Sequence, residues 1–145
     1  MSTNPQALAL FAKGQKHHQA GQLGLAESHY QRVTKLDAAN ADAWHLLGVV
    51  AYQQGKVDKA IRHYRRAVEL RPRAAEMLNN LALALRAHGE FDAAAAAFAQ
   101  AIKIRPEYST AAYNLGLLHE QRGDAAAAEQ AYRQSLATQP NATNT

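Results

Sequence analysis

Apolar and small residues recur along the chain at spacings of three and four residues, and glycine interrupts this pattern at regular intervals. Gly21, Gly55, Gly89 and Gly123 each lie 34 residues from the next. The segments on both sides of each glycine are rich in alanine and leucine and free of proline, which predicts two helices. A glycine between them can end the first helix in the left-handed conformation. The pattern therefore predicts a helical hairpin that is repeated four times.

Other positions repeat in register with these glycines. One column holds Ala26, Ala60, Ala94 and Ala128, a second holds Tyr30, Tyr64, Phe98 and Tyr132, and a third holds Gly14, Gly48, Ala82 and Gly116. We expect Gly48 and Ala60 to let their two helices approach closely, while the aromatic residues fill the remaining space. The columns predict an N-terminal extension (1–6), a repeat domain (7–142) with repeats 7–40, 41–74, 75–108 and 109–142, and a C-terminal tail (143–145).

The ends of the predicted helices carry their own signals. Asp58, Asp92 and Asp124 are expected in the first turn of the second helices, where a carboxylate interacts favourably with the helix dipole. Pro72, Pro106 and Pro140 end the second helices in three repeats. A single hairpin cannot cover its own apolar faces, so the hairpins must stack. The predicted fold is an all-α, right-handed α-solenoid of four helix-turn-helix repeats with eight helices.

The second repeat resembles the consensus of the tetratricopeptide repeat (TPR) family. The matching residues are Trp44, Leu47, Gly48, Gly55, Ala60, Tyr64, Ala67 and Pro72. The first repeat departs most, with Lys13 where the others carry leucine. The resemblance, to the TPR arrays of bacterial scaffold proteins and of proteins similar to O-GlcNAc transferase, implies a non-enzymatic protein-protein interaction scaffold. Such a scaffold would bind a peptide or helix of a partner protein in the concave groove formed by its first helices.

The candidate groove is a stripe on the first helices, opposite their packing side, with residues spaced three, four and three apart. This first-helix stripe comprises Leu8, Phe11, Gln15, His18, Asp42, His45, Val49, Tyr52, Glu76, Asn79, Leu83, Arg86, Thr110, Tyr113, Leu117 and Glu120, with Asn80 and Asn114 beside it. Its mixture of apolar, aromatic and amide groups suits a peptide with apolar anchors and a hydrogen-bonding backbone. The alternative is that these are ordinary semi-exposed helix residues.

Asn80 and Asn114 occupy one column of the repeat. The resemblance to O-GlcNAc transferase implies a ladder of asparagines that hydrogen-bonds the backbone of a bound peptide. An amide suits this role because it both donates and accepts. The first two repeats place Ala12 and Leu46 in this column, so the ladder is half present, and a polar helix surface remains the alternative. Receptors of this family for chaperone C-termini use a carboxylate clamp, of which only Asn80 matches here, so we do not expect that function.

The charge of the chain is concentrated in its second repeat. The sequence contains 16 Lys and Arg against 12 Asp and Glu, a formal net charge of +4. Lys59, Arg62 and Arg66 form a basic stripe on the expected convex side. A solvated helix face is the first interpretation, and docking of an acidic partner or a nucleic-acid backbone is the alternative. No RNA-recognition signature accompanies the stripe, so we do not expect nucleic-acid binding.

Several kinds of chemistry are excluded or lack candidates. The chain has no cysteine, which excludes disulfides, thiol nucleophiles and cysteine metal sites. His17 and His18 are adjacent and point in different directions on a helix, so no metal site is predicted. No catalytic constellation or phosphate loop is visible, and we predict no enzyme activity, catalytic residue or cofactor. The sequence shows neither a membrane-spanning run nor a secretory signal, so a cytoplasmic location is expected.

Two further hypotheses concern the context of the array. The chain could be an excised targeting or regulatory module of a larger enzyme, such as a bacterial glycosyltransferase. The last repeat has no successor in this sequence, and we expect an uncovered apolar patch around Leu118, Ala131, Tyr132 and Leu136. Such a patch commonly marks an interaction surface, so the sequence also predicts a weak homodimer through the last repeat.

Overall fold

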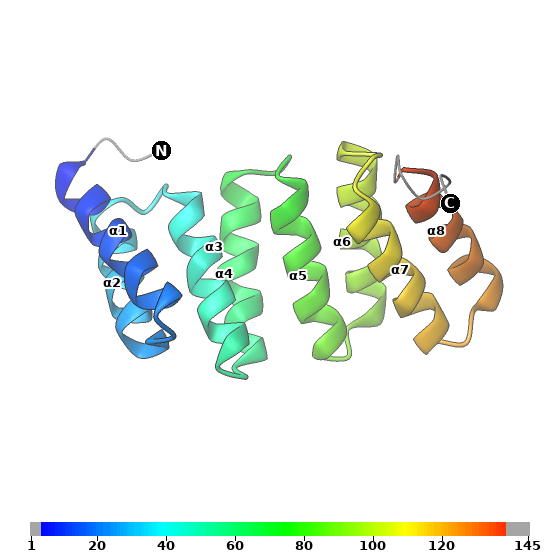
Figure 1. The fold of residues 1–145 in the computed structure, drawn as a ribbon, viewed down its shortest axis with the longest axis horizontal. Helices are drawn as coiled ribbons and strands as arrows, with labels where there is room; N and C mark the ends of the chain where they lie inside the picture. Colours follow the sequence, from blue (N-terminus) through cyan, green and yellow to red (C-terminus); the bar gives the residue numbers. More distant parts are fainter. Residues whose placement is uncertain (1–3, 139–145) are drawn as a thin grey trace. The chain divides into compact units, whose positions relative to one another are not determined.

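The computed structural model describes residues 4–138, and this part of the chain forms eight α-helices and no strand (Figure 1). The helices are α1 (Pro5–Gln19), α2 (Leu23–Leu36), α3 (Ala41–Gln53), α4 (Val57–Leu70), α5 (Ala75–Ala87), α6 (Phe91–Ile104), α7 (Ser109–Gln121) and α8 (Ala125–Ala137). The predicted all-α fold with eight helices is confirmed. Pro140 and the predicted tail (143–145) lie outside the described residues.

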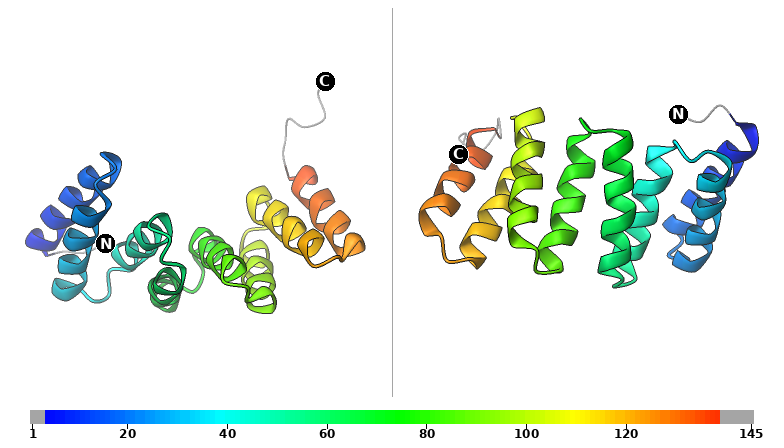
Figure 2. Two further views of the ribbon diagram at one scale, coloured as in Figure 1. Left: turned by 90° about the horizontal axis from the view of Figure 1, so that it is seen from below. Right: turned by 180° about the vertical axis from the view of Figure 1, so that it is seen from behind.

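The chain divides into two compact units between α4 and α5. The N-terminal unit spans Met1–Pro72 and the C-terminal unit spans Arg73–Thr145. Within each unit, consecutive helices pair into two antiparallel hairpins (Figure 2). The second helix of the first hairpin packs against the first helix of the next, as α2 does against α3 and α6 does against α7. Each unit therefore contains one complete interface between neighbouring repeats.

Side chains at the helix N-termini determine where several helices begin. The Asn4 side chain accepts hydrogen bonds at 2.9 and 3.1 Å from two backbone amides of the first turn, and Pro5 follows at the position where its missing N–H is tolerated. For this reason α1 begins two residues before the predicted repeat boundary at 7. Asp58 and Asp92 lie in the first turn of α4 and α6 as expected. Asp124 instead precedes α8 as its N-cap.

The four glycines that set the period form the turns of the hairpins. Gly21, Gly55, Gly89 and Gly123 have φ angles of 75°, 77°, 84° and 79°. They are the positive-φ residues of the described chain, and a side chain would be strained in this conformation. The expectation that glycine ends the first helix of each repeat in the left-handed conformation is confirmed.

A second glycine column makes room for an aromatic ring of the same hairpin. A Cβ atom built on Gly116 would lie 2.5 Å from the Tyr132 ring, and Gly48 faces the Tyr64 ring in the same way. The Tyr64 ring therefore fills the space beside Gly48, as expected for the aromatic column, and the missing side chain of Gly48 makes room for it.

The third repeat has a different pair of residues in the glycine column and the tyrosine column. It has alanine at Ala82, in the glycine column, and phenylalanine at Phe98, in the tyrosine column, and both side chains are fully buried. The two columns therefore differ together in this repeat, as expected if one side chain must fit the other.

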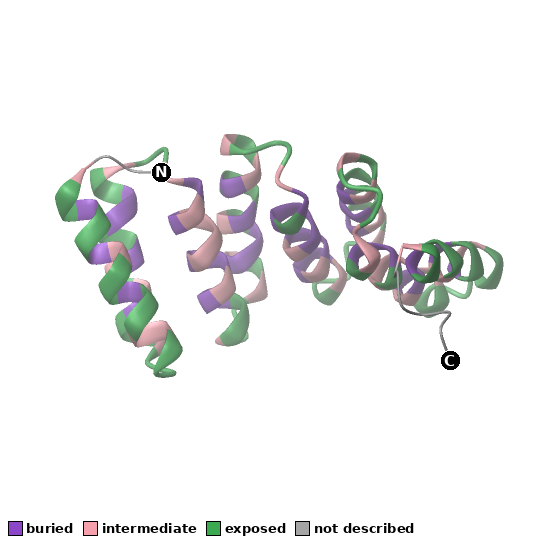
Figure 3. Cartoon of the chain, turned by 45° about the horizontal axis from the view of Figure 1, so that its top comes forward, coloured by how far each residue is buried: buried purple, intermediate pink, exposed green. Residues whose placement is uncertain are grey.

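The core of the N-terminal unit connects its two hairpins. Val33 clusters with Ala43, and Tyr30 clusters with Leu47 and Val50, so side chains of α2 and α3 interdigitate. Tyr30, Val33 and Val50 are fully buried. Figure 3 shows that buried residues line the sides of the helices that meet, while the other sides are exposed. Apolar burial between neighbouring hairpins is thus what holds each unit together.

His63 in α4 is a partly buried histidine that the packing favours in its neutral form. Its ring lies 5.8 Å from the Trp44 ring, and its Nε2 atom has no hydrogen-bond partner within residues 4–138. Burial lowers the pKa of His63, and Lys59 and Arg62 lower it further, against an opposing effect of Glu27. Protonation of this side chain therefore favours the unfolded chain.

Replacement of Gly48 by alanine should destabilise the N-terminal unit by about 1–3 kcal/mol, because the new methyl group meets the Tyr64 ring. Thermal unfolding monitored by circular dichroism measures the effect. Gly24→Ala is the matched control, because no atom lies within 4 Å of its added Cβ, and it should raise stability by up to about 1 kcal/mol. Addition of Tyr64→Phe to Gly48→Ala reproduces the Ala82 and Phe98 pair and should recover part of the loss. Equal melting temperatures for both alanine variants would contradict this packing.

His63→Phe should reduce the loss of stability on acidification. The unfolded chain protonates this histidine near its ordinary pKa of 6.5, whereas the folded chain does so only at a lower pH. The free energy of unfolding should therefore fall as the pH decreases through 6.5 towards the lowered value, and this contribution is absent in the variant. Urea denaturation between pH 7.5 and pH 5 measures the difference. Parallel pH profiles for the two proteins would contradict the assignment.

Candidate functional site

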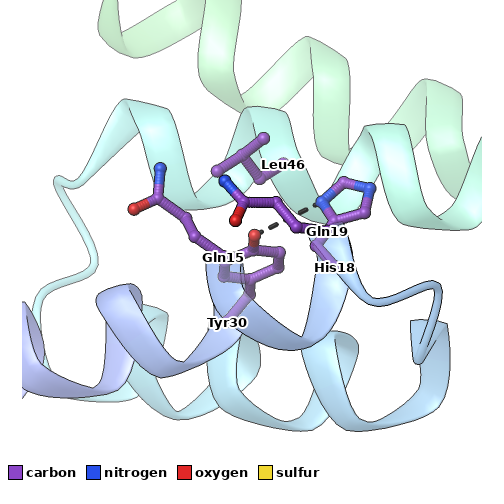
Figure 4. A pocket seen from close by; sticks show the side chains of 5 residues that line it. All are labelled: Gln15, His18, Gln19, Tyr30 and Leu46. Atoms are coloured by element: carbon purple, nitrogen blue, oxygen red, sulfur yellow. Dashed lines mark hydrogen bonds between the residues drawn. The ribbon is translucent and has the colours of Figure 1, made fainter.

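A pocket of about 280 Å³ opens beside α1 in the N-terminal unit (Figure 4). It is lined by Gln15, His18 and Gln19 of α1, Tyr30 of α2 and Leu46 of α3. Gln15 and His18 are predicted groove residues, and the structure brings them together with three residues outside that prediction. The amides of Gln15 and Gln19 are exposed, so each can donate to and accept from a bound molecule.

His18 and Tyr30 form a fixed polar wall of this pocket. The His18 Nδ1 atom lies 3.3 Å from the Tyr30 hydroxyl, and its Nε2 atom lies 2.7 Å from the Gln53 Oε1 atom of α3. A neutral imidazole fits both contacts when the tyrosine hydroxyl donates to Nδ1 and the Nε2 proton is donated to Gln53. Burial raises the pKa of Tyr30 to about 12, so its hydroxyl keeps its proton at neutral pH. The wall connects three helices of the unit.

Not all of the predicted stripe in α3 is accessible to a ligand. Asp42 accepts hydrogen bonds at 3.2 and 3.4 Å from Arg71, so its charge is compensated. The His45 ring packs 5.3 Å from the Tyr64 ring. Val49 is half-buried, while Tyr52 is 41% exposed. Tyr52 is therefore the most exposed aromatic residue of this helix.

In α1 the stripe is likewise divided between packing and exposure. Phe11 is half-buried and its ring lies 5.8 Å from the Tyr30 ring. Leu8 is 41% exposed. Phe11 therefore contributes to the hairpin interface as well as to the surface.

In the C-terminal unit, Asn79 is buried, and its expected place on an exposed stripe is wrong. It is 4% exposed, and its Oδ1 atom accepts a hydrogen bond of 3.2 Å from the Asn114 Nδ2 atom. Its amide also hydrogen-bonds the side chain of Tyr108, whose pKa is raised chiefly by burial and then by the charge of Glu76. This contact joins α5 to α7 inside the unit. One of the two asparagines of the predicted ladder is thus engaged with a neighbouring helix.

The other stripe residues of this unit differ in exposure. Glu76 and Thr110 are exposed, whereas Leu83, Arg86 and Asn80 are half-buried. A stripe of constant sequence spacing therefore presents a surface of uneven accessibility.

A larger hollow, of about 580 Å³, lies between α7 and α8. Tyr113, Leu117 and Glu120 of the stripe line it together with Tyr132, Ser135 and Leu136 of α8. The Tyr132 hydroxyl donates a 2.5 Å hydrogen bond to Glu120, which raises the pKa of Tyr132 to about 12. The Tyr113 and Tyr132 rings lie 5.5 Å apart. The hollow has an apolar and aromatic lining with one carboxylate.

The apolar patch expected on the last repeat is smaller than predicted. Leu118 is fully buried and Ala131 is 5% exposed, because both pack inside the C-terminal unit. Tyr132 is half-buried. Leu136, at 58%, is the exposed member of the predicted set.

The basic stripe of α4 is partly neutralised by neighbouring carboxylates. Lys59 pairs with Glu27 of α2 at 3.1 Å, and Arg66 pairs with Glu69 at 3.2 Å. Arg62 is exposed. Pairing reduces the charge that this face offers to an acidic partner or a nucleic-acid backbone.

Residues 4–138 contain no group of three or more His, Asp or Glu side chains arranged to hold a metal ion. Within the same range, every helix is too short or too polar to cross a lipid bilayer.

The predicted first-helix stripe omits the second helices, which contribute to both hollows. Tyr132 and Leu136 are predicted as part of an uncovered patch on the last repeat, whereas Tyr30 belongs to a column for which packing alone is predicted. The two tyrosine rings do pack, but their hydroxyls reach the pocket walls. The signal was the choice of tyrosine over phenylalanine in three of four repeats, because a hydroxyl in a packed column needs a polar partner.

The family of the chain follows from its sequence profile. The tetratricopeptide repeat model matches residues 11–75, 46–109 and 79–143. The chain belongs to the tetratricopeptide repeat family, and its stacked hairpins are those of a protein-interaction scaffold. The resemblance inferred from the consensus residues of the second repeat is confirmed.

Solved structures share the fold at low sequence identity. A crystal structure of MamA is 24% identical, covers 98% of this chain and 84% of its own, and has a TM-score of 0.90. MamA from Desulfovibrio magneticus RS-1 is 18% identical, with coverages of 96% and 78% and a TM-score of 0.87. YrrB, described as a TPR protein with an unusual peptide-binding site, is 22% identical, with coverages of 93% and 70% and a TM-score of 0.84. No curated protein matches the sequence significantly.

Asn79→Ala should destabilise the C-terminal unit by about 1–3 kcal/mol, because it leaves buried polar groups of Tyr108 and Asn114 without their partner. Thermal unfolding measures this loss. Tyr52→Ala, at an exposed stripe position, is the comparison and should leave the melting temperature nearly unchanged. An Asn79→Ala variant as stable as the parent would show that Asn79 contributes only to the surface.

Proposed function

We propose that this chain is a non-enzymatic scaffold that binds an extended segment of a partner protein along the first helices of its repeats. The pocket formed by Gln15, His18, Gln19, Tyr30 and Leu46 is the observation that carries the proposal. Its walls are held by hydrogen bonds between three helices, so little order has to be gained on binding.

The pocket chemistry suits a peptide backbone with an apolar anchor. The exposed amides of Gln15 and Gln19 match the alternating donors and acceptors of an extended chain. Leu46 gives an apolar contact, and the exposed ring of Tyr52 adds a second anchor on α3. Aromatic residues contribute large contact areas at protein interfaces. A peptide of mixed polar and apolar character is therefore the proposed ligand.

The same surface would serve a targeting or regulatory module of a larger enzyme, such as a glycosyltransferase, because partner binding by the repeats is common to both settings. Docking through the basic stripe has less support, since Lys59 and Arg66 are paired with carboxylates.

Peptide selection tests the proposal and does not require that the partner be identified first. A phage-displayed library of random 15-residue peptides is panned on the whole chain, and selected peptides are synthesised with a fluorescent label. Their affinity should fall at least about tenfold for the double variant Gln15→Ala and Tyr52→Ala, because both side chains are exposed contacts.

Leu25→Ala is the matched control, because Leu25 is 49% exposed but lies outside both hollows. All three proteins should unfold at nearly the same temperature. A selection in which every peptide binds the double variant as tightly as the parent would refute a binding surface on the first helices.

A further inference from the structure

The last repeat leaves open a face that is covered in the first repeat. Tyr30 is fully buried and Thr34 is 8% exposed. The corresponding residues three repeats later are Tyr132, which is half-buried, and Leu136, which is 58% exposed. In the first repeat the covering element is α3, which packs on α2. Within residues 4–138, no helix follows α8 to play the same part.

The way α3 covers the first repeat indicates what the open face can accept. On α3, Ala43 belongs to the same buried cluster as Val33, and Leu47 and Val50 belong to the same buried cluster as Tyr30. These α3 residues come at intervals of four and three residues, which place them on one side of a helix. Three residues further, the Gln53 side chain bonds to His18. The covering helix thus has a small residue, two larger apolar residues and a polar residue in fixed order.

Glu120 in the last repeat takes the place that His18 has in the first. Both side chains hydrogen-bond the tyrosine of the second helix, His18 with Tyr30 and Glu120 with Tyr132. His18 has Gln53 of α3 as its other partner. A carboxylate in place of His18 favours a cationic side chain in place of that glutamine. None of the six residues that line the hollow is a cation, so the carboxylate has no opposite charge beside it in the lining.

We propose that the α7–α8 face binds an amphipathic helix of a partner protein. The helix presents a small residue, then a leucine or valine four and seven residues later, and a lysine or arginine ten residues later that pairs with Glu120. The apolar residues fill the hollow of about 580 Å³ lined by Tyr113, Leu117, Tyr132 and Leu136. This surface is separate from the α1 pocket, so the proposal stands without peptide binding there.

A second copy of the chain is a poorer occupant. A two-fold contact brings like patches together, so two Glu120 carboxylates would enter one apolar interface. In a head-to-tail contact, α1 would take the part of α3. It presents exposed Lys13 and Lys16 at the positions of Leu47 and Val50, and burial of these two ammonium groups against tyrosine and leucine is unfavourable. A partner helix, rather than the weak homodimer predicted from the sequence, is therefore the occupant proposed for this face.

A synthetic peptide based on α3 provides the probe. It carries the sequence of residues 40–54, with lysine in place of Gln53 and a fluorescent label. A lactam between glutamate and lysine at the positions of Gly48 and Tyr52 holds it helical. Gly48 faces α4 in the intact protein, so this bridge avoids the side that contacts the first hairpin. Fluorescence anisotropy with the full chain measures its affinity.

The peptide should bind saturably, and Leu136→Glu should weaken binding at least about tenfold because it places a charge in the apolar hollow. Leu25→Glu, the same change at another exposed leucine, should leave affinity within about twofold. Glu120→Gln keeps a hydrogen-bond acceptor. It should lower the affinity for the lysine peptide about three- to tenfold, while the affinity for a peptide that retains glutamine at this position should hardly change.

Three results would overturn the proposal. One is the absence of saturable binding, and another is equal affinity for Leu136→Glu and the parent. The third comes from sedimentation velocity at several concentrations, if the parent forms a dimer that Leu136→Glu abolishes, because a second copy would then occupy the face. The result for the double variant Gln15→Ala and Tyr52→Ala concerns the α1 pocket alone. Failure of either proposal therefore leaves the other intact.

Discussion

The contact of a tyrosine ring with a residue that has almost no side chain is the interaction on which the hairpins depend. Gly14, Gly48 and Gly116 each lie beneath the ring of the tyrosine 16 positions later. The ring fills the space between the two helices, and its hydroxyl reaches the polar wall of a hollow at Tyr30 and Tyr132. In the first and last hairpins one residue therefore contributes both to the core and to the surface that a partner meets, so the binding surface is as rigid as the packing beneath it.

Much of the fold is determined by features that a repeating sequence displays directly. The glycine turns and the second helices could be predicted because left-handed turns and apolar periodicity depend on neighbouring residues in the chain. The exposure of individual stripe residues could not. Asn79 has the same position in its repeat as the exposed Tyr113, but it is covered because Asn114 of the next repeat and Tyr108, the residue before α7, lie against it. Burial at one position depends on the neighbouring hairpin, which spacing within a single repeat does not describe.

Electrostatic pairing is another property that the sequence left undefined. Lys59 pairs with Glu27, 32 residues away, and Arg71 pairs with Asp42, 29 residues away. In each pair a cation of α4 or its end compensates a carboxylate on another helix. Three of the seven cations of the second repeat, Lys59, Arg66 and Arg71, are paired with carboxylates once the hairpins form. A face with paired charges attracts distant partners less strongly, so recognition there depends more on shape and apolar contact.

The Ala82 and Phe98 pair shows how the packing within a hairpin can vary from one repeat to another. Four hairpins of one period repeat the same design, and three of them keep the pair of glycine and tyrosine. The third repeat differs at both positions, and both of its residues are fully buried. The array therefore contains its own example of a compensated double substitution. The third repeat also lacks the phenol group that the other three hairpins hold between their helices. Neighbouring repeats can thus differ in the polar groups that they offer to a ligand while the interior of each hairpin stays filled.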